Sequence, residues 1–160
     1  MMLWIRALLF TLVVPGTVLV WIPSALRAGG LSSSPWAMLG WLPVAIGIMF
    51  YAISLLKFMA TGGTPMIYFA RFLGFALGEE PPALVERGLY RYTRNPMYVG
   101  GILAVFGQAV LFASWPVALY GLFLIVWFHF LVVTRLEEPH LRRQFGPAYE
   151  VYCQRVPRWL

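Results

Sequence analysis

The longest uncharged run of the sequence covers the 40 residues 95–134, and it restricts the chain to folds that a lipid bilayer can hold. A membrane-spanning helix needs about 20 apolar residues, so this run has room for two, with a turn at Ala113-Ser114-Trp115-Pro116. Two more uncharged runs lie between Arg6 and Arg27 and between Arg27 and Lys57. Only 11% of the residues are charged, against about 25% in soluble domains. We therefore predict an all-α, polytopic membrane protein with about four transmembrane helices, at residues 5–26, 36–58, 96–113 and 116–136.

The distribution of basic residues predicts how these helices are oriented. Four spans place both termini on one side of the membrane, together with the loop from Lys57 to Arg94. That side holds 11 of the 12 basic residues: Arg6, Lys57, Arg71, Arg87, Arg91, Arg94, Arg135, Arg142, Arg143, Arg155 and Arg158. By the positive-inside rule, both termini and this loop are cytoplasmic, in the inner or plasma membrane if the chain is bacterial. The net charge of +6 therefore suits anionic membrane lipids rather than nucleic acid.

Two smaller features concern the path of the chain through the membrane. Pro15-Gly16 predicts a kink in the first helix, and residues 65–77 are too few to span straight, so we expect them to lie at the interface or to re-enter.

Cys153 is the single cysteine and can form no intramolecular disulfide. His129 and His140 are isolated, and no spacing typical of metal ligands occurs, so we predict no metal.

A first polar stretch, residues 88–101, precedes the third predicted span. Asn95 is a good helix N-cap, and Pro96 suits the first helical position. The free N–H groups of such a helix start, with Arg91 and Arg94 beside it, attract anions. Tyr90, Tyr92 and Tyr98 add aromatic faces and hydroxyl groups. The stretch is therefore either a binding corner or an interfacial belt that only anchors the helix. Farther along the same helix, small residues predict close helix packing: Gly100, Gly101, Ala104 and Gly107.

A second polar stretch, residues 134–159, follows the fourth predicted span. Pro139 predicts that this helix bends or ends near Glu137-Glu138. Glu138 stands four residues before Arg142 and is expected to pair with it, whereas Glu137 has no such partner and is expected to face something else. Gly146-Pro147 predicts a new, short cytoplasmic helix. One face of that helix carries Tyr149, Tyr152 and Val156.

The two polar stretches, "LVERGLYRYTRNPMYVG" and "RLEEPHL…FGPAYEVYCQRVPRWL", resemble the signature of the isoprenylcysteine carboxyl methyltransferases, integral-membrane enzymes related to phospholipid N-methyltransferases. The resemblance implies one membrane-embedded domain, 1–160, in which 5–80 form a helical scaffold and 82–160 bind the methyl donor and carry out catalysis. It implies S-adenosylmethionine as the donor, bound at the cytoplasmic face. The contacts that it implies for this donor are Leu84, Val85, Tyr90, Asn95, Pro96, Met97, Tyr98 and Glu137.

The resemblance leaves the methyl acceptor open. Asn95 stands where the family motif usually has histidine, and Val133 stands where the prenylcysteine enzymes place an arginine for the substrate carboxylate. We expect a lipophilic acceptor that enters from the bilayer, with Arg135 orienting it and Glu137 completing the catalytic pair. The acceptor is either an isoprenylcysteine-type carboxylate or the headgroup amine of a phospholipid. A non-catalytic membrane scaffold is the alternative from another class.

Overall fold

The computed structural model describes residues 2–27, 29–63 and 82–160, and every regular element within these ranges is helical. The first rod joins α1 (Met2–Gly16), the π-helical η1 (Thr17–Trp21) and α2 (Ile22–Leu26); the second joins the 3-10 turn η2 (Pro35–Gly40) to α3 (Trp41–Ala60). The short η3 (Gly88–Arg91) precedes α5 (Pro96–Leu111). The last rod joins α6 (Trp115–Trp127), the π-helical η4 (Phe128–Glu137) and α7 (Glu138–Phe145), and α8 (Pro147–Arg155) follows it. The predicted all-α class is confirmed for these ranges. The interfacial or re-entrant segment 65–77 lies outside them.

Three of the four predicted spans have the length and composition to cross a membrane. These are Ala7–Leu26, Pro35–Ala60 and Trp115–Phe145. The predicted third span corresponds to α5, which has 16 residues and a length of about 24 Å at 1.5 Å per residue. That is less than the roughly 30 Å of a bilayer's hydrocarbon core, so length alone does not make α5 a span. The chain is an integral membrane protein with at least three candidate spans in the described residues.

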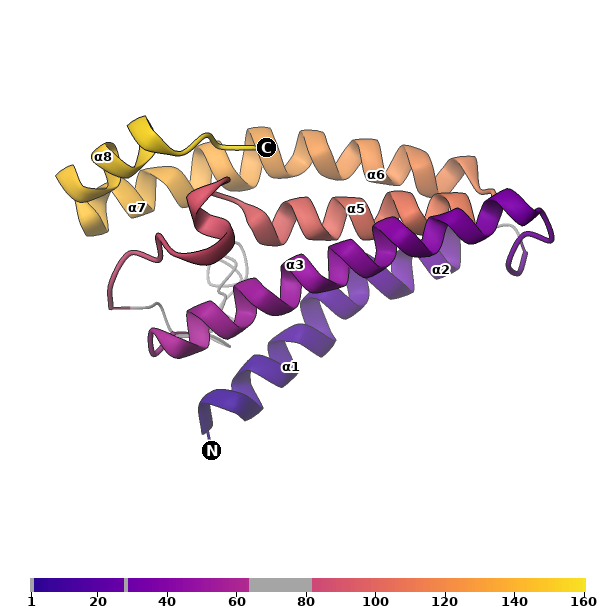
Figure 1. The fold of residues 1–160 in the computed structure, drawn as a ribbon, viewed down its shortest axis with the longest axis horizontal. Coiled ribbons are helices and arrows are strands. Elements are labelled where there is room, and N and C mark those ends of the chain that lie inside the picture. Colours follow the sequence, from indigo (N-terminus) through magenta and orange to yellow (C-terminus); the bar gives the residue numbers. More distant parts are fainter. Residues whose placement is uncertain (1, 28, 64–81) are drawn as a thin grey trace.

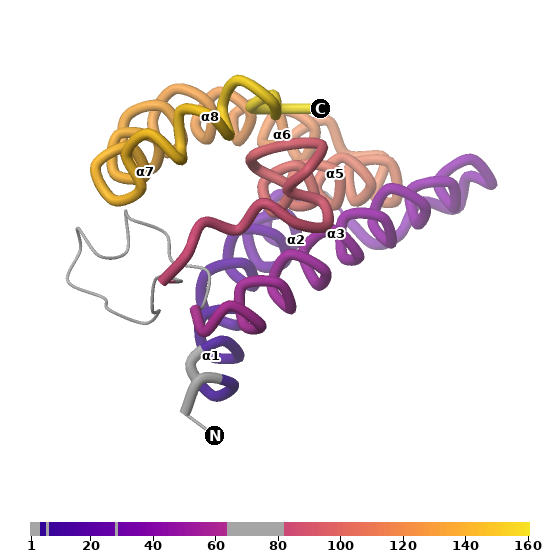
Figure 2. Tube along the Cα trace, turned by 60° about the vertical axis from the view of Figure 1, so that its left-hand side comes forward, coloured from indigo at the N-terminus to yellow at the C-terminus, as the bar shows by residue number. Residues whose placement is uncertain are grey.

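The short helix α5 lies at the centre of the fold. Figure 1 shows it between α6 on one side and α3 on the other, with the first rod beneath α3. Its buried residues include Gly100, Ala104, Val105 and Gly107, whereas α1, α3 and α6 expose many large apolar side chains. Figure 2 shows α1 running away from α6, α7 and α8 toward the N-terminus. The end of α3, the start of α5 and the helices α7 and α8 gather at one end of the bundle (Figure 1).

Glycines bring α3 and α5 into direct backbone contact. A Cβ atom built on Gly100 would stand 2.7 Å from the carbonyl oxygen of Gly47, and a Cβ atom on Gly47 would collide with the carbonyl oxygen of Gly100. Seven residues away along both helices, Gly107 and Gly40 repeat this contact, again with 2.7 Å from the Gly107 Cβ to the Gly40 oxygen. The predicted packing at Gly100 and Gly107 is confirmed. Their partners, Gly40 and Gly47, were not predicted from the sequence.

Both π-helical segments end two residues before a proline. The N–H of Ile22 bonds the carbonyl of Thr17, and the N–H of Glu138 bonds the carbonyl of Val133, so each bond spans five residues. Pro23 and Pro139 follow, and neither has an N–H to donate. The wider π turn accommodates a proline inside a continuous helix. The last rod therefore does not end at Glu137-Glu138 but changes from π to α there and continues to Phe145. Likewise, the first rod stays helical through Pro15 and widens at Thr17.

Side chains of α5 and α6 satisfy the carbonyls that Pro23 leaves without an N–H. The Gln108 amide donates to the carbonyl of Leu19 at 2.7 Å, and the Tyr120 hydroxyl donates to the carbonyl of Val18 at 3.0 Å. Within lipid, an unpaired backbone group costs several kcal/mol. These two bonds therefore hold the first rod against α5 and α6, and they fix one wall of the cavity described next.

Candidate active site

A cavity lies where the start of α5, the π-helical η4 and the helices α7 and α8 meet the first rod. One part of its wall is apolar and includes Phe10, Val14, Val18, Leu19, Gly101, Phe128 and Val133. The other part is polar and includes Tyr51, Tyr90, Arg94, Asn95, Tyr98, Glu137, Glu138 and Tyr149. An apolar chamber that continues into a cluster of charged and phenolic groups suits a ligand with a polar end and a lipophilic end.

The cavity brings together seven of the eight predicted donor contacts: Leu84, Val85, Tyr90, Asn95, Met97, Tyr98 and Glu137. The eighth, Pro96, is buried in the first turn of α5 and does not line the wall. Arg135, the predicted orienting residue, is exposed on η4 and also lies outside the wall. Val133 lines the wall and is only 1% exposed. The position at which the prenylcysteine enzymes place an arginine is therefore an apolar part of this cavity.

Glu137 projects into the cavity and contacts α5. Its carboxylate accepts a hydrogen bond from the Tyr98 hydroxyl, and the Tyr98 ring packs on Phe128 with 4.5 Å between ring centroids. The bond joins residues 39 positions apart in the sequence. This contact supports the expectation that Glu137 faces something other than a basic neighbour on its own helix.

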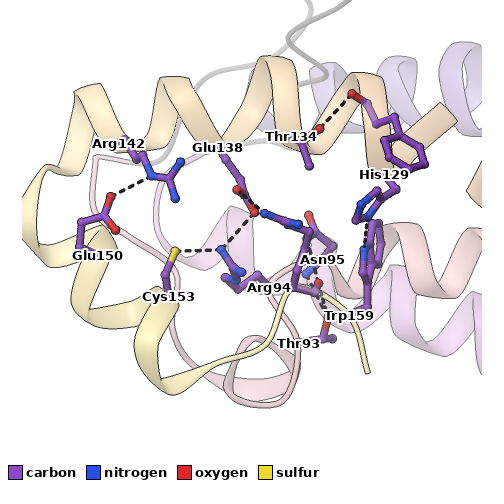
Figure 3. Close-up of polar contacts among 12 residues, drawn as sticks. Thr93, Arg94, Asn95, His129, Thr134, Glu138, Arg142, Glu150, Cys153 and Trp159 are labelled. Atoms are coloured by element: carbon purple, nitrogen blue, oxygen red, sulfur yellow. Dashed lines mark hydrogen bonds and ion pairs between the residues drawn. The ribbon is translucent and has the colours of Figure 1, made fainter. Parts of the chain in front are cut away.

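Glu138 has partners other than the one predicted (Figure 3). Arg158 donates to it twice, at 2.6 and 2.9 Å, and Arg94 donates from Nη1 at 3.1 Å. Arg142 instead donates to Glu150 at 2.8 Å. The predicted Glu138–Arg142 pair is thus wrong, because Glu138 is 3% exposed and takes the two guanidinium groups that enter the interior. The hydrogen bond with Glu138 raises the pKa of Arg158 above its ordinary value, so this buried carboxylate faces fixed positive charge.

The C-terminal residues fasten the loop before α5. The Arg94 N–H donates to the carbonyl of Pro157, and both the Thr93 hydroxyl and the Asn95 side-chain amide donate to the carbonyl of Arg158. Beyond them, the Trp159 indole donates to Nδ1 of His129 at 2.8 Å (Figure 3). Asn95 lines the cavity, yet its amide nitrogen binds the chain's own C-terminal segment. His129, which is isolated in the sequence, has a partner inside the protein.

Helix α8 covers the polar part of the cavity. Tyr149, Tyr152 and Val156 form a buried cluster against Leu84, Leu141 and Phe145, which confirms the predicted shared face. The Tyr152 hydroxyl donates to the carbonyl of Tyr90 at 2.8 Å, and the Tyr90 ring meets the edge of Phe58 at 5.7 Å. Burial raises the pKa of the Tyr90 phenol far above its ordinary value, so that phenol is neutral.

Two arginines of the site, Arg94 and Arg158, are not among the predicted site residues. Arg94 lines the cavity, whereas its place in the sequence indicates only a neighbour of the helix start. Arg158 lies 20 residues beyond Glu138, and no local spacing rule connects them. The sequence position of Arg94 could have indicated its place in the site, since it directly precedes two predicted contact residues, Asn95 and Pro96. In the described parts of the chain, no group of three or more His, Cys, Asp or Glu side chains forms a metal site.

The sequence profile of the family described as phospholipid methyltransferase matches residues 36–148. The chain belongs to this family. The matched region contains α3, α5, the last rod and most of the cavity wall, and the sequence-based assignment to this group of enzymes is confirmed.

Individual relatives share shorter or more distant matches. Protein-S-isoprenylcysteine O-methyltransferase B of Arabidopsis thaliana is 34% identical over 79 residues, which are 49% of this chain and 40% of the plant protein. Phosphatidylethanolamine N-methyltransferase of Emericella nidulans is 33% identical over 49% of this chain and 8% of its own length. Delta(14)-sterol reductase LBR of Gallus gallus is 29% identical over 87% of this chain and 23% of its own length. The chain thus aligns with less than half of each relative, and no solved structure matches it.

Proposed function

We propose that this protein transfers a methyl group from S-adenosylmethionine to a lipophilic acceptor within the membrane. The observation that carries the proposal is the convergence of two distant stretches, 84–98 and Glu137, on one cavity. A protein that only anchored itself with these stretches would need no cavity between them. Membership of the phospholipid methyltransferase family and the names of the methyltransferase relatives support the same conclusion.

The residues of the cavity fit the parts of the donor. The donor carries a sulfonium, an amino acid group, a ribose and an adenine. Glu137 suits the amino group or the ribose hydroxyls, and the ring faces of Tyr90 and Tyr98 suit the cation and the adenine. The bound sulfonium supplies an already activated methyl group. The protein's task is then to align the acceptor with that methyl group and to exclude water.

The apolar part of the cavity suits the acceptor. Phe10, Val14 and Val18 of the first rod line it together with Phe128 and Val133 of η4. We propose that the lipid chain of the acceptor enters this chamber from the bilayer. Arg135 lies on the exposed surface of η4, and we propose that it meets the acceptor's headgroup outside the chamber.

Incubation of membranes with methyl-labelled S-adenosylmethionine tests the proposed function. Membranes that contain the protein should incorporate label into an extractable lipid or a lipidated protein, and membranes with empty vector should not. Separation of the lipid and protein fractions then distinguishes a phospholipid acceptor from a prenylated protein. If the purified protein neither binds the donor nor incorporates label, the scaffold alternative holds.

The apolar environment of Val133 predicts which acceptors are poor substrates. A carboxylate in this part of the cavity would meet a valine side chain that is 1% exposed, and an unpaired carboxylate in an apolar site is strongly disfavoured. We therefore expect N-acetyl-S-farnesylcysteine to be methylated at least about tenfold less efficiently than a phospholipid amine, which corresponds to roughly 1.4 kcal/mol. The kcat/KM values for the two acceptors give the comparison. Efficient, saturable turnover of the farnesyl compound would contradict the expectation.

The charge distribution predicts the sidedness of the membrane protein. Since 11 of the 12 basic residues fall on one side of a four-span arrangement, reporters at the N- and C-termini should both be cytoplasmic. This topology also requires α5 to cross the membrane despite its 16 residues. A reporter fused to each terminus, one active in the cytoplasm and one active outside it, measures the orientation. An external signal from either end would reject the four-span topology.

A further inference from the structure

Arg94 lies in the wall of the cavity, and not all hydrogen-bond donors of its guanidinium group have an acceptor in the part of the chain that the structure describes. Its Nη1 atom donates to Glu138 at 3.1 Å and to the sulfur of Cys153 at 2.8 Å, and its side chain also has Tyr149 as a hydrogen-bond partner. A thiol sulfur is a weak acceptor, and an arginine has five N–H donors. Its Nε atom is buried and has no hydrogen-bond partner among the described residues. The side chain is 12% exposed, so little water is available to make up for the missing acceptors.

Glu138 does not complete the bonding of Arg94, because Arg158 already occupies it. Arg158 makes the two shorter bonds, at 2.6 and 2.9 Å, with both carboxylate oxygens. One carboxylate therefore serves two guanidinium groups. This arrangement fixes the position of Arg94 at the cavity wall and leaves its charge only partly compensated. A buried charge of this kind requires a further acceptor.

A carboxylate of the opposite sign, that of Glu137, lines the same cavity. Glu137 bonds to Tyr98 of α5, while Arg94 lies just before that helix. The wall therefore presents a carboxylate and a guanidinium to the same space. An occupant with separated positive and negative groups would satisfy both.

From this geometry we propose that Arg94 forms an oxyanion-binding subsite in the cavity, and that it takes a carboxylate or a phosphate of the occupant. The inference rests on the proposed function and extends it to one further residue. The oxyanion comes either from the amino acid end of the methyl donor or from the phosphate of a lipid acceptor. An arginine held by Glu138 is pre-organised for either group, because a guanidinium matches the geometry of both.

Binding to detergent-purified protein tests the subsite with four probes. The first is S-adenosylhomocysteine, and the second is S-adenosyl-3-thiopropylamine, which lacks only the carboxylate; both are titrated by calorimetry. The third is dioleoylphosphatidic acid, and the fourth is dioleoylglycerol, which lacks the phosphate; native mass spectrometry counts both lipids. The variants are Arg94→Gln, Arg94→Lys and the control Arg91→Gln, which changes an exposed arginine outside the cavity wall.

If the donor supplies the oxyanion, Arg94→Gln should bind S-adenosylhomocysteine roughly 10- to 150-fold more weakly and bind the decarboxylated analogue as the wild type does. If a lipid supplies the oxyanion, Arg94→Gln should bind phosphatidic acid more weakly than the wild type does, while its binding of dioleoylglycerol should be unchanged. Arg94→Lys should retain part of the binding, and Arg91→Gln should retain all of it. Glu138 keeps both bonds to Arg158 in these variants, so they should fold, which the melting temperature checks.

Unchanged binding of both oxyanion probes, or equal loss of each probe and its neutral analogue, would overturn the subsite. Failure of the wild type to bind either adenosyl compound would instead overturn the proposed methyltransferase function, while the lipid probes would still test the subsite. If Arg94→Gln does not fold, the binding measurements are made with Arg94→Lys and the wild type. Lysine retains the charge but not the planar fork of donors.

Discussion

Replacement of Glu137 by glutamine is expected to weaken binding of S-adenosylmethionine by roughly 10- to 150-fold, because a hydrogen bond to a charged group contributes about 1.5–3 kcal/mol. Glutamine has nearly the same size and can still accept the bond from Tyr98, but it carries no charge for an amino group of the donor. Titration calorimetry of the donor, or of S-adenosylhomocysteine, into the purified variant measures the loss. Unchanged affinity would remove Glu137 from the donor site.

Two neighbouring carboxylates provide the controls for this variant. Glu150→Gln alters an exposed ion pair with Arg142 and should leave donor affinity unchanged. Glu138→Gln should mainly lower the melting temperature, because it leaves Arg94 and Arg158 without their buried carboxylate, and breaking a buried pair destabilises a protein by about 3–5 kcal/mol. A larger loss of donor affinity in folded Glu138→Gln than in Glu137→Gln would reverse the roles assigned to the two residues.

Local sequence patterns predicted the main helices of this fold. Long uncharged runs fixed the helices, because lipid leaves few alternatives to helical backbone. The pair Asn95-Pro96 marked the first residue of α5, which begins at Pro96. The motif around Tyr90, Tyr98 and Glu137 predicted residues that line one cavity. Each of these features depends on neighbours within a few positions or on a spacing that the family signature defines.

Features that depend on tertiary contacts could not be predicted in the same way. The i,i+4 rule pairs Glu138 with Arg142. In the structure, the buried Glu138 binds Arg94 and Arg158 instead, and Arg142 binds Glu150. Helical rules predict that the last rod bends or ends near Glu137-Glu138, because Pro139 follows. The π turn instead absorbs the proline, and the helix continues to Phe145. An energetic preference for a local pair is only a few tenths of a kcal/mol, so a buried alternative easily outweighs it.

The contact between α3 and α5 predicts a second loss of stability, which spreads from a helix interface to the cavity. Gly47→Ala places a methyl group against the carbonyl of Gly100 and 2.9 Å from the backbone nitrogen of Ala104. Both obstacles are helix backbone, which cannot rotate away, so the two helices must separate along their whole contact. Overpacking of this kind costs about 1–3 kcal/mol, which corresponds to a melting temperature lower by roughly 2–12 °C. Donor affinity should fall with it, because α5 carries Met97 and Tyr98 into the cavity.

Gly16→Ala is the matched control for this substitution. Gly16 also lies in a membrane helix, but its added Cβ atom would meet only the carbonyl of Thr11 at an ordinary 3.6 Å. Alanine favours helix over glycine by about 1 kcal/mol, so Gly16→Ala should melt at the wild-type temperature or above it. Thermal unfolding in the same detergent compares the two. If Gly47→Ala proved as stable as Gly16→Ala, the backbone contact between α3 and α5 would not be what holds the central helix in place.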